Sequence, residues 1–590
     1  MRLLVFLAPI AAGSFACASG GSGPPKRAPI ATRFDDAPRF TPKGRLETLA
    51  EASTSDLPES LGLMTPTFSL EGPYGDPLRP KPHPVGSEFS RAMVEHAAGA
   101  KGLEAHDGMA CVARQLGRFW LLHQTLPAEP LQAFVTARCG AQVSQLRFRS
   151  VFGDNPRRMP LARVEEQWAS DLDKLKGSFQ GELDIGAWAG KREDKVIFMV
   201  AAGTREARVN AVRREDDALI LEGQVFTPNV EEAYVLVNQG PYGVARCEPT
   251  GGAALPAFRF RCPVLPSDSH TWLDFMVRPR RQILGRTVLA LLRPIGGSLP
   301  DAWADPLDLP EQVVTSTTEL GSAVLTAING TRAQAGLSAL HLEPAETHTA
   351  SRLSSPYFDA QEGRPSLADE IALGLMAGWD VDGKVRSAGF AALALSQTRD
   401  ASTLATSLLG RPFGRSVVLD PEASRVAVGA TLGRAAAGAG VVVTTYTTFG
   451  TEPPALHAEE VKRQLNALRA RSNLAPAEDL PTLRPIAQAA ADEITARRAN
   501  PDDALKEALE NASRSLQAPV QGWWLQASSL ADLPFETAMT AAPETKVAIG
   551  VGIHAPLEEP WARWIVIVIA PMGGGRTAGG QDVRGRLAAH

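Results

Sequence analysis

The chain has 590 residues, of which 44% are apolar and 21% are charged, so it is long enough for about three to five domains with buried cores. It carries 60 lysines and arginines against 65 aspartates and glutamates, which gives a formal net charge of −5. No lysine-rich or arginine-rich run interrupts this balance. The composition therefore argues against nucleic acid as a partner.

The first residues have the pattern of an export signal. The apolar run Leu3–Ala12 is too short to span a bilayer, and Ser14–Cys17 follows it in a pattern similar to a bacterial lipobox, with Ser14 where that pattern prefers leucine. The Gly, Ser and Pro residues of Ala18–Arg27 are typical of a tether. We therefore expect a bacterial cell-envelope lipoprotein anchored in a membrane through Cys17. The alternative is ordinary cleavage near Ala16, which would give a secreted or soluble periplasmic protein.

Four cysteines remain after Cys17, namely Cys111, Cys139, Cys247 and Cys262. An even number of cysteines in an exported chain indicates disulfides. Three pairings are open, and the simplest joins Cys111 to Cys139 and Cys247 to Cys262. Some of the four could instead be buried free thiols.

The apolar pattern along the chain predicts repeated α/β units of the α/β (α+β) class. Around Gly186, Gly429 and Gly550, an apolar strand that contains the glycine is followed by a second apolar strand. Residues 205–298 differ, because their short strand-like runs and turn clusters predict a small β-sandwich. The expected segments are a signal with lipobox (1–17), a flexible tether and irregular lead-in (18–84), an α/β unit (85–204), the β-sandwich (205–298), two further α/β units (310–452 and 455–572) and a flexible tail (573–590).

The unit at 310–452 resembles the CAP superfamily, the domain of cysteine-rich secretory proteins and plant pathogenesis-related proteins. The resemblance lies in the helix Leu325–Leu337, the segment Arg411–Pro421, and Ser424–Ala430 with its closing strand. The resemblance to the CAP superfamily is weaker in the unit at 455–572 and only general in the unit at 85–204. The resemblance implies an α-β-α sandwich in each unit, the copies at 85–204 and 455–572 being degenerate or shorter.

The same alignment also shows where the chain departs from the family. Many CAP domains hold a divalent metal with two His and two Glu, and one His precedes an arginine in a Ser-Pro-Gly-His-Arg segment. Here Gly414 stands at that position, before Arg415, and Ala360 lies where a second His follows an aromatic pair. Of the two acids, only Glu370 lies in the right stretch. Glycine cannot ligate a metal or transfer a proton, so we expect no metal, cofactor or catalytic residue in this cleft.

A cluster of His341, Glu343, Glu346 and His348 is a second set of metal-ligand types. Residues two apart on a helix point about 200° apart, so Glu346 and His348 cannot share an ion there. We therefore interpret this cluster as a solvated helix entrance.

Three functions remain open from the sequence. The first is a non-catalytic envelope lipoprotein whose CAP-like domains bind or scaffold an unidentified envelope protein, glycan or lipid. The second is a peptidase-like envelope hydrolase with a non-standard site that uses Glu370, His341 or His348. The third is a binder of lipids or hydrophobic ligands in a groove between helices.

Overall fold

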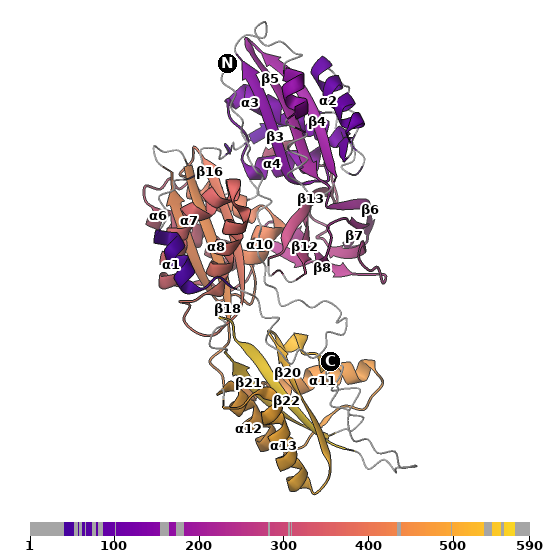
Figure 1. The fold of residues 1–590 in the computed structure, drawn as a ribbon, viewed down its shortest axis with the longest axis vertical. Helices are drawn as coiled ribbons and strands as arrows, with labels where there is room; N and C mark the ends of the chain where they lie inside the picture. Colours follow the sequence, from indigo (N-terminus) through magenta and orange to yellow (C-terminus); the bar gives the residue numbers. More distant parts are fainter. Residues whose placement is uncertain are drawn as a thin grey trace. The chain divides into compact units, whose positions relative to one another are not determined.

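The chain forms two compact units in a computed structural model (Figure 1). Unit 1 comprises Thr41–Met376 and Gly389–Thr445, and unit 2 comprises Ala377–Ala388 and the residues from Tyr446 onward. The structure describes residues 40–51, 57, 62–64, 67–72, 78, 80, 87–100, 102–153, 164–170, 172, 182–280, 282, 284–304, 307, 309–433, 438–496, 498–535, 546–555 and 560–572. The predicted signal, the anchor Cys17 and the tail 573–590 lie outside these residues, as does much of the lead-in 18–84.

The first sheet in unit 1 has the strand order β2-β4-β5-β3. β2 runs parallel to β4, and both β4 and β3 run antiparallel to β5. Helices cover both faces, because Ile185 on β4 packs in the cluster that contains α2, whereas Gly186 lies directly against Met109 of α3. The strands are β2 (Leu103–Ala105), β3 (Ser144–Gly153), β4 (Leu183–Arg192) and β5 (Lys195–Thr204), and the helices are α2 (Glu88–Gly99), α3 (Asp107–His123) and α4 (Glu129–Arg138).

Two four-stranded sheets follow in the sequence, with strand orders β10-β11-β7-β6 and β13-β12-β8-β9. Apolar side chains from both sheets, including Leu221, Phe260, Phe275 and Val235, share one core, as expected for a β-sandwich. The strands are β6 (Ala207–Glu215), β7 (Ala218–Val225), β8 (Val230–Gln239), β9 (Gly243–Arg246), β10 (Glu248–Pro249), β11 (Ala257–Pro263), β12 (His270–Pro279) and β13 (Arg286–Pro294).

The second α/β sheet has the order β15-β17-β18-β16, and β15 is parallel to β17. Successive residues of β17 point to opposite faces of the sheet, and a different helix covers each face. Val428 lies against Gly321 of α6, and Gly429 lies against Ala350 of α7. A capping box between Ser316 and Glu319 begins α6. The strands are β15 (His341–Leu342), β16 (Val385–Ser396), β17 (Arg425–Leu432) and β18 (Gly438–Thr448), and the helices are α6 (Thr317–Gln334), α7 (Pro344–Gly363), α8 (Pro365–Ala377), α9 (Ala401–Leu409) and α10 (Pro412–Val418).

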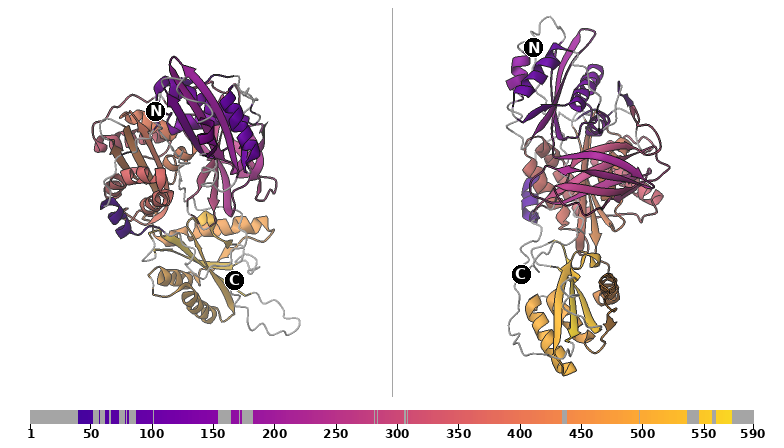
Figure 2. Two further views of the ribbon diagram at one scale, coloured as in Figure 1. Left: turned by 45° about the horizontal axis from the view of Figure 1, so that its top comes forward. Right: turned by 90° about the vertical axis from the view of Figure 1, so that its right-hand side faces the viewer.

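Unit 2 contains the third α/β sheet, in the order β19-β21-β22-β20, with helices on both of its faces (Figure 2). Ile549 packs in the core that includes α11, whereas Ala548 and Ile567 pack with α12 and α13. The strands are β19 (Glu478–Asp479), β20 (Val520–Ala527), β21 (Lys546–His554) and β22 (Arg563–Pro571), and the helices are η4 (Pro454–His457), α11 (Ala458–Arg471), α12 (Arg484–Thr495), α13 (Pro501–Leu516) and η5 (Leu530–Asp532).

All three α/β sheets thus begin with a short strand that pairs in parallel with the first strand of a hairpin. The second and third sheets also share a side-chain bridge before that short strand. Asn329 hydrogen-bonds both backbone groups of Leu340, and Asn466 does the same with Ala477, eleven residues on in each case. The predicted α+β class is confirmed.

The lead-in is more ordered than the sequence suggests. α1 (Lys43–Glu51) buries Leu46 against Gly374 of α8, and β1 (Thr67–Ser69) pairs antiparallel with β14 (Ala302–Ala304). The expectation of a wholly irregular lead-in is therefore wrong for these two segments. Few apolar residues mark them in the sequence, because each is completed by partners more than 200 positions away.

Two disulfides join Cys111 to Cys139 and Cys247 to Cys262, the simplest of the three pairings. Such bonds are typical of an oxidising, exported location. Among the described helices, none is long and apolar enough to cross a membrane.

Candidate functional site

The CAP-like positions singled out from the sequence are not brought together. Gly414 and Arg415 lie on α10, whose Val417 accepts a hydrogen bond from Thr445 on β18. Ala360 lies on α7, which packs against the opposite face of the same sheet, and Glu370 lies on α8. No shared cleft is therefore formed by these four residues.

Gly414 occupies a position that has no room for a side chain. A Cβ atom placed there would lie 1.9 Å from the carbonyl oxygen of Leu408, which is a backbone atom and cannot simply rotate away. The backbone here therefore requires glycine, and a histidine at this position would need a shift of α9 or α10.

Arg415 has a structural role that is visible in its contacts. Its guanidinium is buried and donates hydrogen bonds to the carbonyl oxygens of Leu409 at 2.6 Å, Gly240 at 2.7 Å and Gly243 at 3.0 Å. Burial lowers the pKa of Arg415 to about 10, with Asp268 opposing the shift. The side chain thereby ties α10 to the turn between β8 and β9 of the sandwich.

Ala360 and Glu370, the other two CAP-like positions, also have structural surroundings. Ala360 is fully buried. Glu370 is half-exposed and accepts a hydrogen bond from the Nε of Arg45 at 2.8 Å, while its carbonyl oxygen accepts one from Thr41 at 2.6 Å. These bonds hold the lead-in helix α1 against α8.

The expected solvated helix entrance at His341–His348 needs correction. His341 and His348 are exposed, but Glu343 and Glu346 are buried, at 4% and 1% exposure. Glu343 pairs with Arg425 at 2.9 Å, across the parallel pairing of β15 with β17. Within the described part of the chain, no group of three or more His, Cys, Asp or Glu side chains could hold a metal ion.

A cavity of about 100 Å³ lies in unit 1, where α4, the sandwich strands β12 and β13, and the helices α9 and α10 meet. Most of its wall is apolar, and the polar side chains that line it are Glu129, Thr136, Ser144, Asp274, Thr287, Ser407 and Arg411. Gly414 also contributes to the wall. The cavity therefore lies beside Gly414, although the residues that give it charge come from elsewhere.

A buried ion pair forms one side of this cavity. Asp274 on β12 is fully buried and accepts hydrogen bonds from the Arg411 guanidinium and, at 3.1 Å, from the backbone N–H of Phe413. The guanidinium also lies over the ring of Trp272, 4.6 Å from its centroid. Both oxygens of the Asp274 carboxylate thus have donors, and the pair joins α10 to the sandwich.

Glu129, at the first turn of α4, faces the same cavity without a partner of its own. No hydrogen bond or ion pair to its carboxyl group exists among the described residues. Burial raises its pKa, the Arg411 guanidinium opposes the shift, and the Asp274 carboxylate adds to it. Glu129 is partly exposed. The hydroxyl group of Ser407 in the cavity wall is buried and has no hydrogen-bond partner.

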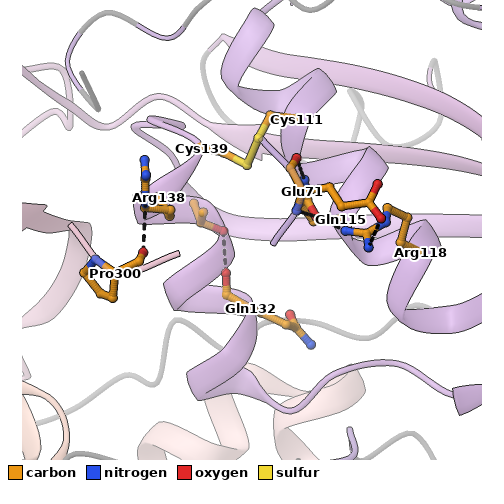
Figure 3. The surroundings of a disulfide bond; sticks show 9 residues. Glu71, Cys111, Gln115, Arg118, Gln132, Arg138, Cys139 and Pro300 are labelled. Atoms are coloured by element: carbon orange, nitrogen blue, oxygen red, sulfur yellow. Dashed lines mark hydrogen bonds and ion pairs between the residues drawn. A yellow bond between two sulfur atoms is a disulfide. The ribbon is translucent and has the colours of Figure 1, made fainter. Parts of the chain in front are cut away.

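The first disulfide links α3 to the end of α4, the helix that carries Glu129 (Figure 3). It joins Cys111 on α3 to Cys139 at the end of α4, with the Cα atoms 5.6 Å apart. Next to it, the Nε of Arg138 donates to the carbonyl oxygen of Pro300 at 3.1 Å, and its Nη2 pairs with Asp301 at 2.6 Å. The C-terminal end of the helix that carries Glu129 is therefore held by a covalent bond and by an ion pair.

No protein-family model matches this sequence, and no curated protein matches it. Among solved structures, a cysteine-rich secretory protein from Staphylococcus aureus shares 10% sequence identity with it, at a TM-score of 0.18. The similarity covers 40% of this chain and 84% of that chain. A score this low carries no argument, so the family resemblance still depends on the sequence motifs.

Proposed function

We propose that the chain is an exported cell-envelope protein that uses its CAP-like α/β units for binding or scaffolding rather than for metal-dependent catalysis. The observation that carries this proposal is Gly414, where the backbone leaves no room for the family's histidine. The two disulfides support the exported location. Anchoring through a lipid on Cys17 is part of the proposal.

The three α/β units are, in this proposal, copies of one domain. The shared strand order supports it, as do the matching Asn329 and Asn466 bridges. Two buried arginines match as well: Arg332 donates to the carbonyl oxygen of Ser338 and Arg469 to that of Ala475, six residues on in each case. Such repeated units present several similar surfaces, which suits a protein that holds a partner at more than one point.

Co-sedimentation with purified envelope material tests the binding function. The full mature chain is mixed with peptidoglycan sacculi or with phospholipid vesicles, and both the bound protein and the soluble fragments are measured. We expect saturable binding to one of these materials without release of fragments. Release of glycan or peptide fragments that is lost on substitution of Glu370, His341 or His348 would instead support the hydrolase, and absence of binding to both would reject the proposal.

Anchoring is tested separately by cell fractionation. The wild-type chain is expected in the membrane fraction, and Cys17→Ser is expected in the soluble fraction. Equal distribution of the two chains would remove the lipid anchor from the proposal and leave the rest intact.

A further inference from the structure

The cavity beside Gly414 is built from segments far apart in the sequence. Its walls come from the strands β3, β12, β13 and β16 and from the helices α4, α9 and α10. Its apolar part is formed by side chains such as Val143, Leu146, Val288, Leu289 and Leu393. One water molecule needs roughly 10–15 Å³ of such space. About 100 Å³ therefore admits a small organic molecule in place of several waters.

The charges around the cavity do not balance. Arg411 and Asp274 neutralise one another, and the guanidinium also lies over the ring of Trp272. The Nε–H of Arg411 is buried without an acceptor. Glu129 has no cation of its own within hydrogen-bonding distance among the described residues. When Glu129 is ionised, the three groups sum to one negative charge beside a largely apolar wall, and a cationic ligand would neutralise that charge.

We infer that this cavity binds a small organic ammonium ion with a short apolar body. The ammonium group donates to the Glu129 carboxylate, and the Ser407 hydroxyl, which lacks a partner, is a second acceptor in the wall. The alkyl part of the ligand replaces water against the apolar wall. The net charge disfavours an anion, because the guanidinium of Arg411 is already paired with Asp274 and a further negative charge would face both Glu129 and Asp274.

This inference goes beyond the envelope function and does not depend on it. The cavity lies inside unit 1, and Glu370, His341 and His348, the residues of the hydrolase alternative, do not line it. Gly414 contributes to its wall, but the charged residues of the cavity play no part in the envelope proposal.

Calorimetric titration of the full mature chain with n-butylammonium chloride tests the inference. Titrations with n-butanol and with sodium butyrate, at pH 8 and matched ionic strength, separate the contribution of charge from that of the alkyl chain. We expect saturable binding of butylammonium, with butanol at least tenfold weaker and butyrate weaker still, because a hydrogen bond to a charged group contributes about tenfold or more in affinity.

Glu129→Gln keeps the shape of the side chain and removes its charge, so it should weaken butylammonium binding at least about tenfold. Glu215→Gln is the matched control, because Glu215 at the end of β6 is exposed and its side chain has no ion pair or hydrogen bond among the described residues. Equal affinities of wild type and Glu129→Gln would overturn the inference, as would butanol or butyrate binding as well as butylammonium.

A second variant covers the case in which Glu129→Gln does not fold. Ala133→Leu, one turn further along α4, adds a larger apolar side chain to the cavity wall without changing any charge. We expect it to abolish butylammonium binding by filling the space. Unchanged binding in a folded Ala133→Leu chain would place the ligand elsewhere and reject the cavity as its site.

Discussion

Alanine substitution at two helical glycines, Gly330 and Gly414, tests quantitatively whether the backbone at Gly414 leaves room for a side chain. An added Cβ atom at Gly330 on α6 would have no other atom within 4 Å, whereas at Gly414 it would lie 1.9 Å from the carbonyl oxygen of Leu408. Both substitutions gain about 1 kcal/mol of helix propensity. Only the second also forces two backbone segments apart, by roughly 1.5 Å if ordinary contact at 3.4 Å is to be restored.

Because the propensity gain is common to both variants, the difference between their free energies of unfolding isolates the clash. Overpacking of this kind costs about 1–3 kcal/mol. We therefore expect Gly330→Ala to be more stable than wild type, and Gly414→Ala to be less stable than Gly330→Ala by about 1–3 kcal/mol.

Urea titration read out by hydrogen exchange is the suitable assay, since a chain of several units does not unfold in one two-state step. Peptides from β17 and β18 report the sheet that both helices cover. If the two variants are stabilised equally, α10 adjusts without cost. The backbone at Gly414 could then accept a histidine, and the main support for the non-catalytic proposal would fail.

Three further changes have outcomes that follow from described contacts. Arg332→Lys should lower stability by about 3 kcal/mol or more, measured by the same exchange assay, because one ammonium cannot reach the four backbone carbonyls that the buried guanidinium serves. The pKa of Glu129 is raised in the folded chain, so the folded state binds the proton of this carboxyl group more tightly than the unfolded state does. The resulting stabilisation is complete below about pH 4 and is lost as the pH rises through the pKa of Glu129 in the folded chain. Glu129→Gln should remove that part of the fall in urea midpoint between acidic and neutral pH, and an unchanged pH profile would contradict it. Replacing Cys111 and Cys139 together by serine should lower the free energy of unfolding by about 2–5 kcal/mol, because it removes the disulfide between them. A double variant with the melting temperature of the oxidised wild type would refute this disulfide.

The sheets were predictable from the sequence because their signals are local. Val426–Ala430 and Val547–Gly552 each combine an apolar strand with a glycine, and the glycine is needed where α7 or α12 approaches the strand closely. The sandwich was predictable for the same reason, since its strands are short apolar runs between turns. The structure adds the matching strand order of all three α/β sheets.

The candidate site was not predictable, because no local signal marks it. Glu129 is a single acid at a helix start, and Asp274 is a single acid in an apolar strand. Asp274 and Arg411 are 137 positions apart. An aspartate inside an apolar run is the one available hint, since a buried acid needs a cationic or hydrogen-bonding partner, but the sequence does not say which.

The docking of α1 on α8 has a consequence for how the chain is made. Arg45 leaves the ribosome 325 residues before its partner Glu370, and the first α/β sheet and the sandwich lie between β1 and β14 in the sequence. At roughly 5–20 residues per second, synthesis of that interval takes on the order of 15–65 s. For that period the lead-in helix has no surface to cover, so a factor that binds newly made chains can reach the apolar face of α1 before α8 exists.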